Sequence, residues 1–246
     1  MLQSPGHLAT ERPLKNYMNK FYSNKTSINY YKNNRSKIKH LYKSERFFFS
    51  KISKKCNSFL DVGCALGNFV KIIKKIKKGN FEYMGLDNQA LLIKLAKKKF
   101  PNKKFHIIRN HRFPNNNKFD LVFCLGTLHH ISNWRRYILS MKKRANKYLL
   151  FDVRITKQNT INSDKQFQKI TFGKKWDGKS KIRYITIKKK EFNFFLKKNF
   201  KNFKVQINKY EHKVGDGYVG IHKKVFMTTV LCKKFNKKNE NKKIFK

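Results

Sequence analysis

Residues 58–68 read SFLDVGCALGN, an apolar run that closes on an acidic residue and then enters a turn with two glycines. The run from Ser58 to Val62 has the length and the aromatic and β-branched content that favour a buried strand. Apolar side chains then recur at helical spacing over 68–77, at Phe69, Val70, Ile72, Ile73 and Ile76. A strand, a glycine turn and a helix in this order predict the first β-α unit of a parallel sheet.

The same alternation continues along the chain. Further strands are predicted at 81–86, 104–108, 119–124 and 148–152, and further helices at 88–100 and 134–145. Pro101 ends the second helix, because its ring cannot continue one. Residues 119–124 read FDLVFC, an almost unbroken apolar run that suits a parallel strand covered on both faces. We therefore predict an α/β fold with a doubly wound, mostly parallel sheet.

The regular alternation of predicted strands and helices ends after residue 152. A long polar stretch runs to about residue 181, and the patterns beyond it predict a strand at 183–187, a helix at 191–200 and two late strands at about 204–209 and 225–232. We expect three regions: an N-terminal extension and substrate cap at 1–50, the main domain at 51–232 and a basic tail at 233–246.

The charge of the chain is strongly one-sided. Its 246 residues include 60 Lys and Arg against 13 Asp and Glu, a formal net charge of +47. Such a surface attracts polyanions, with nucleic acid and anionic membranes as the physical candidates. Lys, Asn, Phe, Tyr and Ile together also dominate chains encoded by AT-rich genes, and the lysines are spread along the whole sequence. A nucleic-acid partner and simple compositional drift therefore both stay open.

The cysteines and the hydropathy pattern indicate the kind of compartment in which the protein works. Cys56, Cys64, Cys124 and Cys232 show no CxxC spacing, so we expect no metal site and no disulfide framework, as in a reducing cytosol. No apolar run approaches the roughly 20 residues that span a bilayer. We expect a soluble, cytoplasmic protein, and the sequence leaves its oligomeric state open.

The segment from Phe59 to Phe69 resembles motif I of the class I S-adenosylmethionine-dependent methyltransferases, in which a strand ends in an acid and a glycine-rich turn opens the next helix. Glycines allow the backbone to approach a ligand at the carboxyl end of the strand. Where the family usually has three alternating glycines, this chain has Gly63, Ala65 and Gly67, and Ala65 suits the place if its φ is negative. The GxGxxG pattern of dinucleotide sites fails here, because it requires glycine in place of Ala65 and Asn68.

A carboxylate follows at the end of the second predicted strand. Asp87 can accept hydrogen bonds from both hydroxyls of a ribose, and it can equally cap the helix that follows. The resemblance implies that Asp61 lies near the methionine end of the cofactor and Asn110 near the adenine amino group. The implied cofactor contacts are Asp61, Gly63, Cys64, Ala65, Gly67, Asp87, Asn88, Asn110 and Leu125.

Residues 119–131 read FDLVFCLGTLHHI and carry the second resemblance, to small-molecule methyltransferases with a Leu-His-His turn after the fourth strand. His129 and His130 are the candidate catalytic bases, because imidazole titrates near neutral pH. A packing role for the turn is equally open, and Cys124 is expected as a buried strand residue. The family fold implies a seven-stranded sheet whose last strand is antiparallel.

The resemblance implies an enzyme that uses S-adenosyl-L-methionine. We expect O-methylation of a small molecule or of a sugar- or lipid-linked acceptor. An RNA methyltransferase that uses the basic surface and a non-catalytic adaptor are the alternatives. The Asn/Asp-Pro-Pro-Tyr/Phe signature of enzymes that methylate base amines is absent. Side chains suited to an anionic or sugar-like acceptor are Tyr30, Tyr42, Arg46, Arg154, Trp176, Arg183 and Tyr218.

Overall fold

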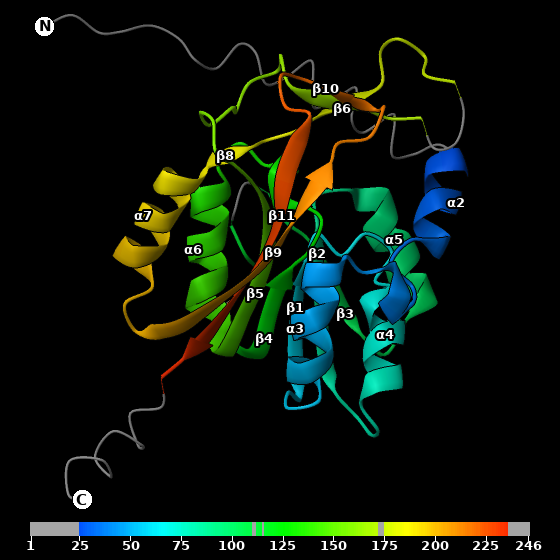
Figure 1. The fold of residues 1–246 in the computed structure, drawn as a ribbon. Helices are drawn as coiled ribbons and strands as arrows, with labels where there is room; N and C mark the ends of the chain where they lie inside the picture. The colour runs from blue at the N-terminus through cyan, green and yellow to red at the C-terminus, as the bar shows by residue number, and fades with distance from the viewer. Residues whose placement is uncertain (1–24, 110–111, 115, 172–174, 236–246) are drawn as a thin grey trace, which may run out of the picture.

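The computed structural model describes residues 25–109, 112–114, 116–171 and 175–235. Within them, eight strands form a central sheet with helices on both faces (Figure 1). These strands are β1 (Ser58–Val62), β2 (Glu82–Asp87), β3 (Lys104–Ile107), β4 (Phe119–Cys124), β5 (Ala145–Thr156), β8 (Ile187–Lys188), β9 (Phe203–Lys213) and β11 (Lys224–Lys234). The order across the sheet is β3-β2-β1-β4-β5-β11-β9, and β8 pairs with β5.

The pairing confirms the predicted fold class. β1 runs parallel to β2 and β4, and β3 and β5 extend the parallel part on either side. β11 is antiparallel to both β5 and β9. The carboxyl ends of β1, β2 and β4 therefore meet at one edge of the sheet, where open α/β sheets bind ligands. The short β8 adds one strand to the seven that the resemblance implied.

Two helical layers enclose the sheet. The helices and short 3-10 turns are α2 (Lys25–Asn33), η1 (Ile38–His40), α3 (Lys43–Ser53), α4 (Phe69–Ile76), α5 (Ala90–Lys99), η2 (Leu128–His130), α6 (Trp134–Arg144) and α7 (Lys189–Asn199). Buried side chains of α6 and α7 form one core with one face of the sheet. Those of α3, α4 and α5 form a second core with the other face. Each large apolar side chain buried in this way contributes about 1.5–3 kcal/mol.

The N-terminal segment is divided differently from the expectation. Residue 50, the predicted boundary, lies inside α3. Phe48, Phe49 and Ile52 of that helix are buried in the second core, so α3 is part of the main domain. Of the described residues before it, α2 lies beside the carboxyl edge of the sheet (Figure 1). The tail predicted from residue 233 begins inside β11, and residues 236–246 lie outside the described part.

A second, three-stranded sheet stands beyond that edge. It consists of β6 (Phe167–Lys169), β7 (Lys181–Arg183) and β10 (Tyr218–Val219), in the order β10-β6-β7. The single strand expected at 183–187 is wrong, because backbone N–H groups between β7 and β8 bond elsewhere. Tyr184 N donates to Gln166 O at 3.1 Å, and Ile185 N donates to His129 O at 2.7 Å. These bonds tie the segment to the residue before β6 and to the turn after β4.

Candidate functional site

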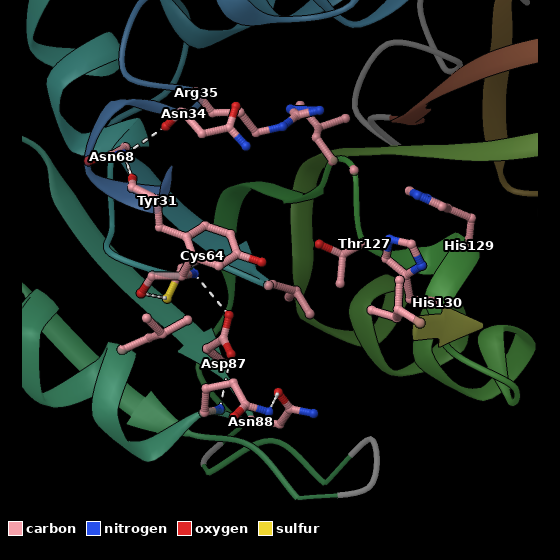
Figure 2. Close-up of a pocket in the computed structure, with 18 of the residues that line it drawn as sticks. Tyr31, Asn34, Arg35, Cys64, Asn68, Asp87, Asn88, Thr127, His129 and His130 are labelled. Carbon is pink, nitrogen blue, oxygen red and sulfur yellow. Dashed lines mark hydrogen bonds between the residues drawn. The ribbon is translucent and has the colours of Figure 1, made fainter. Parts of the chain in front are cut away.

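A cavity of about 530 Å³ opens at the carboxyl ends of β1, β2 and β4 (Figure 2). Its volume lies within the range of small-molecule sites, about 300–1,000 Å³. Its walls come from the turn after β1, the end of β2, the turn after β4, and the N-terminal segment. Lining residues from these four places include Gly63, Cys64, Ala65, Asp87, Asn88, Leu125, Gly126, Thr127, Tyr30, Tyr31, Asn34 and Arg35. Segments far apart in the sequence thus enclose one space.

The glycine turn after β1 is tight and has little spare room. Gly63 has a φ of +84°, and a Cβ there would lie 2.7 Å from the Thr127 Cγ2 atom. Gly63 N and Cys64 N both donate to Leu86 O, at 2.7 and 3.0 Å. A side chain at residue 63 would have to displace Thr127 and adopt a left-handed backbone, so this position requires glycine.

Ala65 corrects one expectation. Its φ is +45°, not negative, so a non-glycine residue occupies the left-handed region at this turn. That conformation costs roughly 1–2 kcal/mol for a residue with a Cβ. The Ala65 N–H donates to Asp87 Oδ2 at 2.9 Å, and this bond holds the turn against the end of β2.

Asp87 presents a carboxylate to the cavity. Its Oδ2 accepts from Ala65 N, and its Oδ1 accepts from Gln89 N at 3.0 Å. Burial raises the pKa of this carboxyl, and the backbone hydrogen bonds act against the rise. A carboxylate has about four acceptor positions, so it can accept further hydrogen bonds beside those from the backbone. The second bond goes to Gln89, which is itself the N-cap residue of α5, so Asp87 is not the cap of that helix.

Two of the implied cofactor residues that the structure describes, Asp61 and Gly67, do not line this cavity. Asp61 is buried behind the turn, where its carboxylate accepts from the Tyr83 hydroxyl at 2.6 Å. Burial raises the pKa of Asp61 to about 7. Gly67 faces Phe105 instead, since a Cβ there would lie 2.6 Å from that ring. Asn110 lies outside the described residues.

The two histidines lie at the turn after β4. Both line the cavity, and Figure 2 shows their rings on the opposite side from Asp87. Their ring centroids are 3.9 Å apart. His130 Nδ1 lies 2.7 Å from Arg183 O. A carbonyl oxygen can only accept, so Nδ1 carries the proton and Nε2 keeps a lone pair.

The protonation of the pair follows from burial. Burial lowers the pKa of His130 to about 4 and that of His129 well below its usual value. Both rings are therefore neutral at neutral pH. Among the described residues, His129 Nδ1 has no hydrogen-bond partner.

The N-terminal segment contributes residues that sequence reasoning missed. Asn68 Nδ2 donates to Tyr31 O and Asn34 O, both at 2.7 Å, so the start of α4 holds α2 over the cavity. Lys99 Nζ donates to Asn68 Oδ1 at 2.6 Å and orients the amide. The partners of Asn68 are backbone oxygens more than 30 residues away, which no local pattern could indicate.

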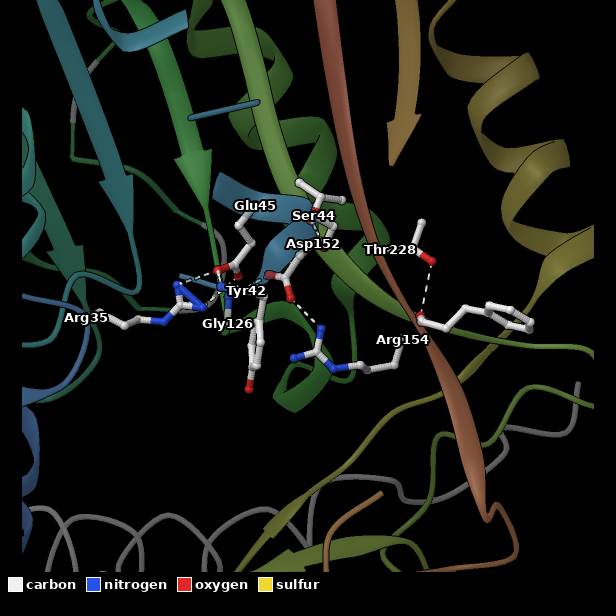
Figure 3. Close-up of polar contacts among 10 residues, drawn as sticks. Arg35, Tyr42, Ser44, Glu45, Gly126, Asp152, Arg154 and Thr228 are labelled. Carbon is white, nitrogen blue, oxygen red and sulfur yellow. Dashed lines mark hydrogen bonds and ion pairs between the residues drawn. The ribbon is translucent and has the colours of Figure 1, made fainter. Parts of the chain in front are cut away.

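A buried charge network stands behind the cavity (Figure 3). Arg35 donates to both carboxylate oxygens of Glu45, at 3.0 and 2.6 Å. Asp152, on β5, accepts from Gly126 N at 2.5 Å and pairs with Arg154. Burial raises the pKa of Glu45 to about 7. Gly126 is restricted here too, since a Cβ would lie 2.8 Å from the Arg35 guanidinium.

The remaining side-chain chemistry follows from burial. All four cysteines are free and buried, and Cys124 is a strand residue as expected. Burial raises the pKa of Cys56 and of Cys232 to about 12. In the part of the chain that the structure describes, no cluster of three His, Cys, Asp or Glu side chains is placed to hold a metal ion. No described helix has both the length and the hydrophobicity to cross a membrane.

Comparisons of the sequence lead to one family. A methyltransferase domain family matches residues 60–147, from β1 into β5. Among curated proteins, the candidate methyltransferase 235L of Invertebrate iridescent virus 6 is 28% identical over 131 residues, or 49% of this chain and 47% of that protein. This chain thus spans about half the length of that relative.

Solved structures share the fold at low identity. An S-adenosylmethionine-dependent methyltransferase from Clostridium acetobutylicum has a TM-score of 0.50 and 15% identity, over 78% of this chain and 91% of that one. The N-terminal domain of EvdMO1, solved with SAH and D-fucose, has a TM-score of 0.54 and 12% identity, over 78% and 81%. An O-methyltransferase of a trans-AT PKS multienzyme from Brevibacillus brevis, in complex with S-adenosyl-L-homocysteine, has a TM-score of 0.50 and 13% identity, over 63% and 49%.

That the Leu-His-His turn marks the small-molecule methyltransferases stays a prediction. The family match covers the strands and turns that build the cavity, and the observed sheet order agrees with the fold that motif I implied. Residues 60–147 thus match a methyltransferase domain family, and the chain has the fold of S-adenosylmethionine-dependent methyltransferases.

Proposed function

We propose that this protein binds S-adenosylmethionine in the 530 Å³ cavity and methylates an oxygen atom of a small molecule. Asp87 carries the cofactor assignment, because its carboxylate faces the cavity with acceptor capacity left beside its backbone hydrogen bonds. The two adjacent hydroxyls of a ribose can donate to its oxygens. The turn from Gly63 to Ala65 and the backbone at Leu125 line the same space.

The fit extends to the apolar part of the cavity. Leu92, Ile108 and Tyr137 line it together with Asp87 and Asn88. A flat aromatic base can pack among such side chains while its sugar meets the carboxylate. Asn110, the residue implied to lie near the adenine amino group, follows this region in the sequence and stays a prediction.

His130 is our candidate for the base that prepares the acceptor. When bound, the cofactor supplies an electrophilic methyl group, so the acceptor oxygen must arrive with a free electron pair and give up its proton. His130 Nε2 can take that proton while Nδ1–H stays bonded to Arg183 O. The charge of Asp152 favours the protonated ring, and Arg154 opposes it. A positioned base of this kind contributes about 10²–10⁴-fold.

Oxygen is the favoured acceptor atom for two reasons. A hydroxyl needs a base, and the neutral His130 supplies one next to the cavity. Among proteins with a similar fold, one is named an O-methyltransferase and another was solved with the sugar D-fucose.

The proposal is tested in two stages. Calorimetry with S-adenosylhomocysteine should show one saturable site in the wild-type protein, and absence of binding at millimolar ligand would refute the cofactor assignment. Incubation with S-adenosylmethionine that carries a labelled methyl group, first with a metabolite extract and then with bulk RNA, should place label in the small-molecule fraction. Label found only in RNA would replace this proposal by the RNA methyltransferase alternative.

A further inference from the structure

A second, smaller cavity of about 100 Å³ adjoins the first over β5, β9 and β11. The two cavities share Tyr42, His129 and Gln168 as lining residues. Arg154, Met227 and His212 contribute from the three strands, and Arg154 and Met227 are paired neighbours on β5 and β11. Tyr218 and Gln168 of the three-stranded sheet cover it from the other side. The proposed cofactor contacts leave this space unused.

Arg154 is the unusual side chain in the small cavity. Only 2% of it is exposed, and its guanidinium pairs with Asp152 through Nη1. Its Nε is buried and has no hydrogen-bond partner among the described residues. A buried donor left without an acceptor costs about 1–3 kcal/mol. Figure 3 shows the head group beside Tyr42, and its Cζ lies 5.4 Å from the centroid of that ring.

The one full charge on the described walls of the small cavity is positive. Among its described lining residues, Arg154 alone carries a full charge at neutral pH, because burial lowers the pKa of both His129 and His212. Asp152 pairs with Arg154 but is not among the lining residues. Tyr42, Tyr184 and Tyr218 add hydroxyl groups to the same walls. Guanidinium groups bind carboxylates strongly, since the geometries of the two groups match.

We propose that the small cavity binds a carboxylate of the methyl acceptor, so that the acceptor is a small hydroxy acid. Its carboxylate contacts Arg154, and its hydroxyl faces His129 at the junction of the two cavities and His130 in the larger one. Because Asp152 already balances one charge on Arg154, a singly charged carboxylate suits the cavity better than a doubly charged phosphate ester. A space of about 100 Å³ is small beside the roughly 300–1,000 Å³ of ligand pockets, so it holds a carboxylate and a few more atoms. This inference rests on the proposed function.

The test uses matched pairs of probes and reads binding directly. The probes are 3-hydroxybutyrate and 3-hydroxybenzoate, each compared with its primary amide, which has the same shape without the charge. Ligand-observed NMR on the full chain measures the affinity of each. We expect each acid to bind the wild type at least tenfold more tightly than its amide.

Variants assign that preference to Arg154. In the double variant Asp152→Asn/Arg154→Gln, the two opposite charges leave together, so no buried charge loses its partner, and Asn keeps an acceptor for Gly126 N. We expect this variant to lose the preference for acids and to keep its thermal unfolding transition. Arg136→Met removes one positive charge from the exposed face of α6 and controls for attraction by the net charge. It should keep the wild-type preference.

Each outcome of these binding measurements either supports or overturns the inference. Equal binding of acids and amides by the wild type, or a preference that survives in the double variant, overturns the inference. A preference lost equally in Arg136→Met also overturns it, since the net charge would then be the cause. Calorimetry with S-adenosylhomocysteine separates the two proposals. Cofactor binding without acid selectivity removes this inference alone, whereas acid selectivity without cofactor binding removes the proposed function and the acceptor assignment with it.

Discussion

Asp87 and His130 lie on opposite sides of the larger cavity, and backbone groups orient each side chain. Two backbone N–H groups fix the Asp87 carboxylate, and one backbone carbonyl fixes the His130 ring. Backbone partners leave the other side of each group available to a ligand. We therefore expect Asp87 to determine the affinity for the cofactor and the surroundings of His130 to determine its protonation state.

Asp87→Ala should weaken the binding of S-adenosylhomocysteine about 100-fold. The substitution removes two charge-assisted hydrogen bonds to ribose, worth about 1.5–3 kcal/mol each, and part of that loss is recovered by water. Calorimetry measures the change. Glu82→Ala is the matched control, because Glu82 is an exposed carboxylate at the other end of β2. An Asp87→Ala protein that binds as tightly as the control would disprove the ribose contact.

His130 should stay neutral in the folded protein down to about pH 5, since burial lowers its pKa to about 4. Its proton should reside on Nδ1, bonded to Arg183 O. Imidazole ¹⁵N spectra of histidine-labelled protein, with the signals assigned through His130→Gln, report both the tautomer and the titration. A His130 that titrates near pH 6.5, or that carries its proton on Nε2, would exclude the hydrogen bond and the proposed base.

Among the secondary-structure elements, the strands and helices of the parallel part of the sheet could be predicted from the sequence. The short strands that cover the small cavity could not. The apolar run of β4 and the helical spacing of α4 are local patterns that report burial directly. β6 and β10 pair residues about 50 positions apart, and each is only two or three residues long. Such pairing leaves no periodic signal, so the cover of the small cavity emerged only from the structure.

The attachment of α2 to α4 can be tested by removing the side chain that makes it. Asn68→Ala removes both hydrogen bonds that tie the end of α2 to α4. We expect amide hydrogen exchange in α2 to accelerate about tenfold or more, because each lost bond is worth about 0.5–1.5 kcal/mol. Mass spectrometry of exchanged peptides measures this. Peptides of α3 serve as the internal control, since that helix packs in the core. Equal acceleration in α2 and α3 would mean general destabilisation and would contradict the tether.

For the whole molecule, Asp61 links stability to pH. Its folded pKa of about 7 lies above its ordinary value of 3.8, so the folded state holds a proton that the unfolded chain has released. The stability that this group contributes is complete below pH 3.8 and is lost as pH rises to about 7. Asp61→Asn keeps an acceptor for the Tyr83 hydroxyl and removes the titration.

The midpoint of thermal unfolding of Asp61→Asn, relative to the wild type, should therefore rise between pH 5 and pH 8. Two pKa units correspond to about 2.7 kcal/mol, or several degrees for a chain of this size. Differential scanning calorimetry at the two pH values measures the change. Comparing the variant with the wild type cancels the contributions of Glu45, His129 and His130, which titrate in both proteins. A difference that is constant or falls with pH would contradict the raised pKa.

The net charge and the cavities lead to different expectations about RNA. A chain with a formal charge of +47 should bind RNA at low salt, and the logarithm of its affinity should fall linearly and steeply with the logarithm of salt concentration. The small cavity, at about 100 Å³, has no room for a nucleotide beside Arg154. We therefore expect RNA to bind without being methylated. Electrophoretic shifts at 50 and 200 mM salt, together with labelled-methyl counting of the bound RNA, measure both. Salt-resistant binding accompanied by methylation would show that the basic surface serves catalysis and would reverse the assignment of the acceptor.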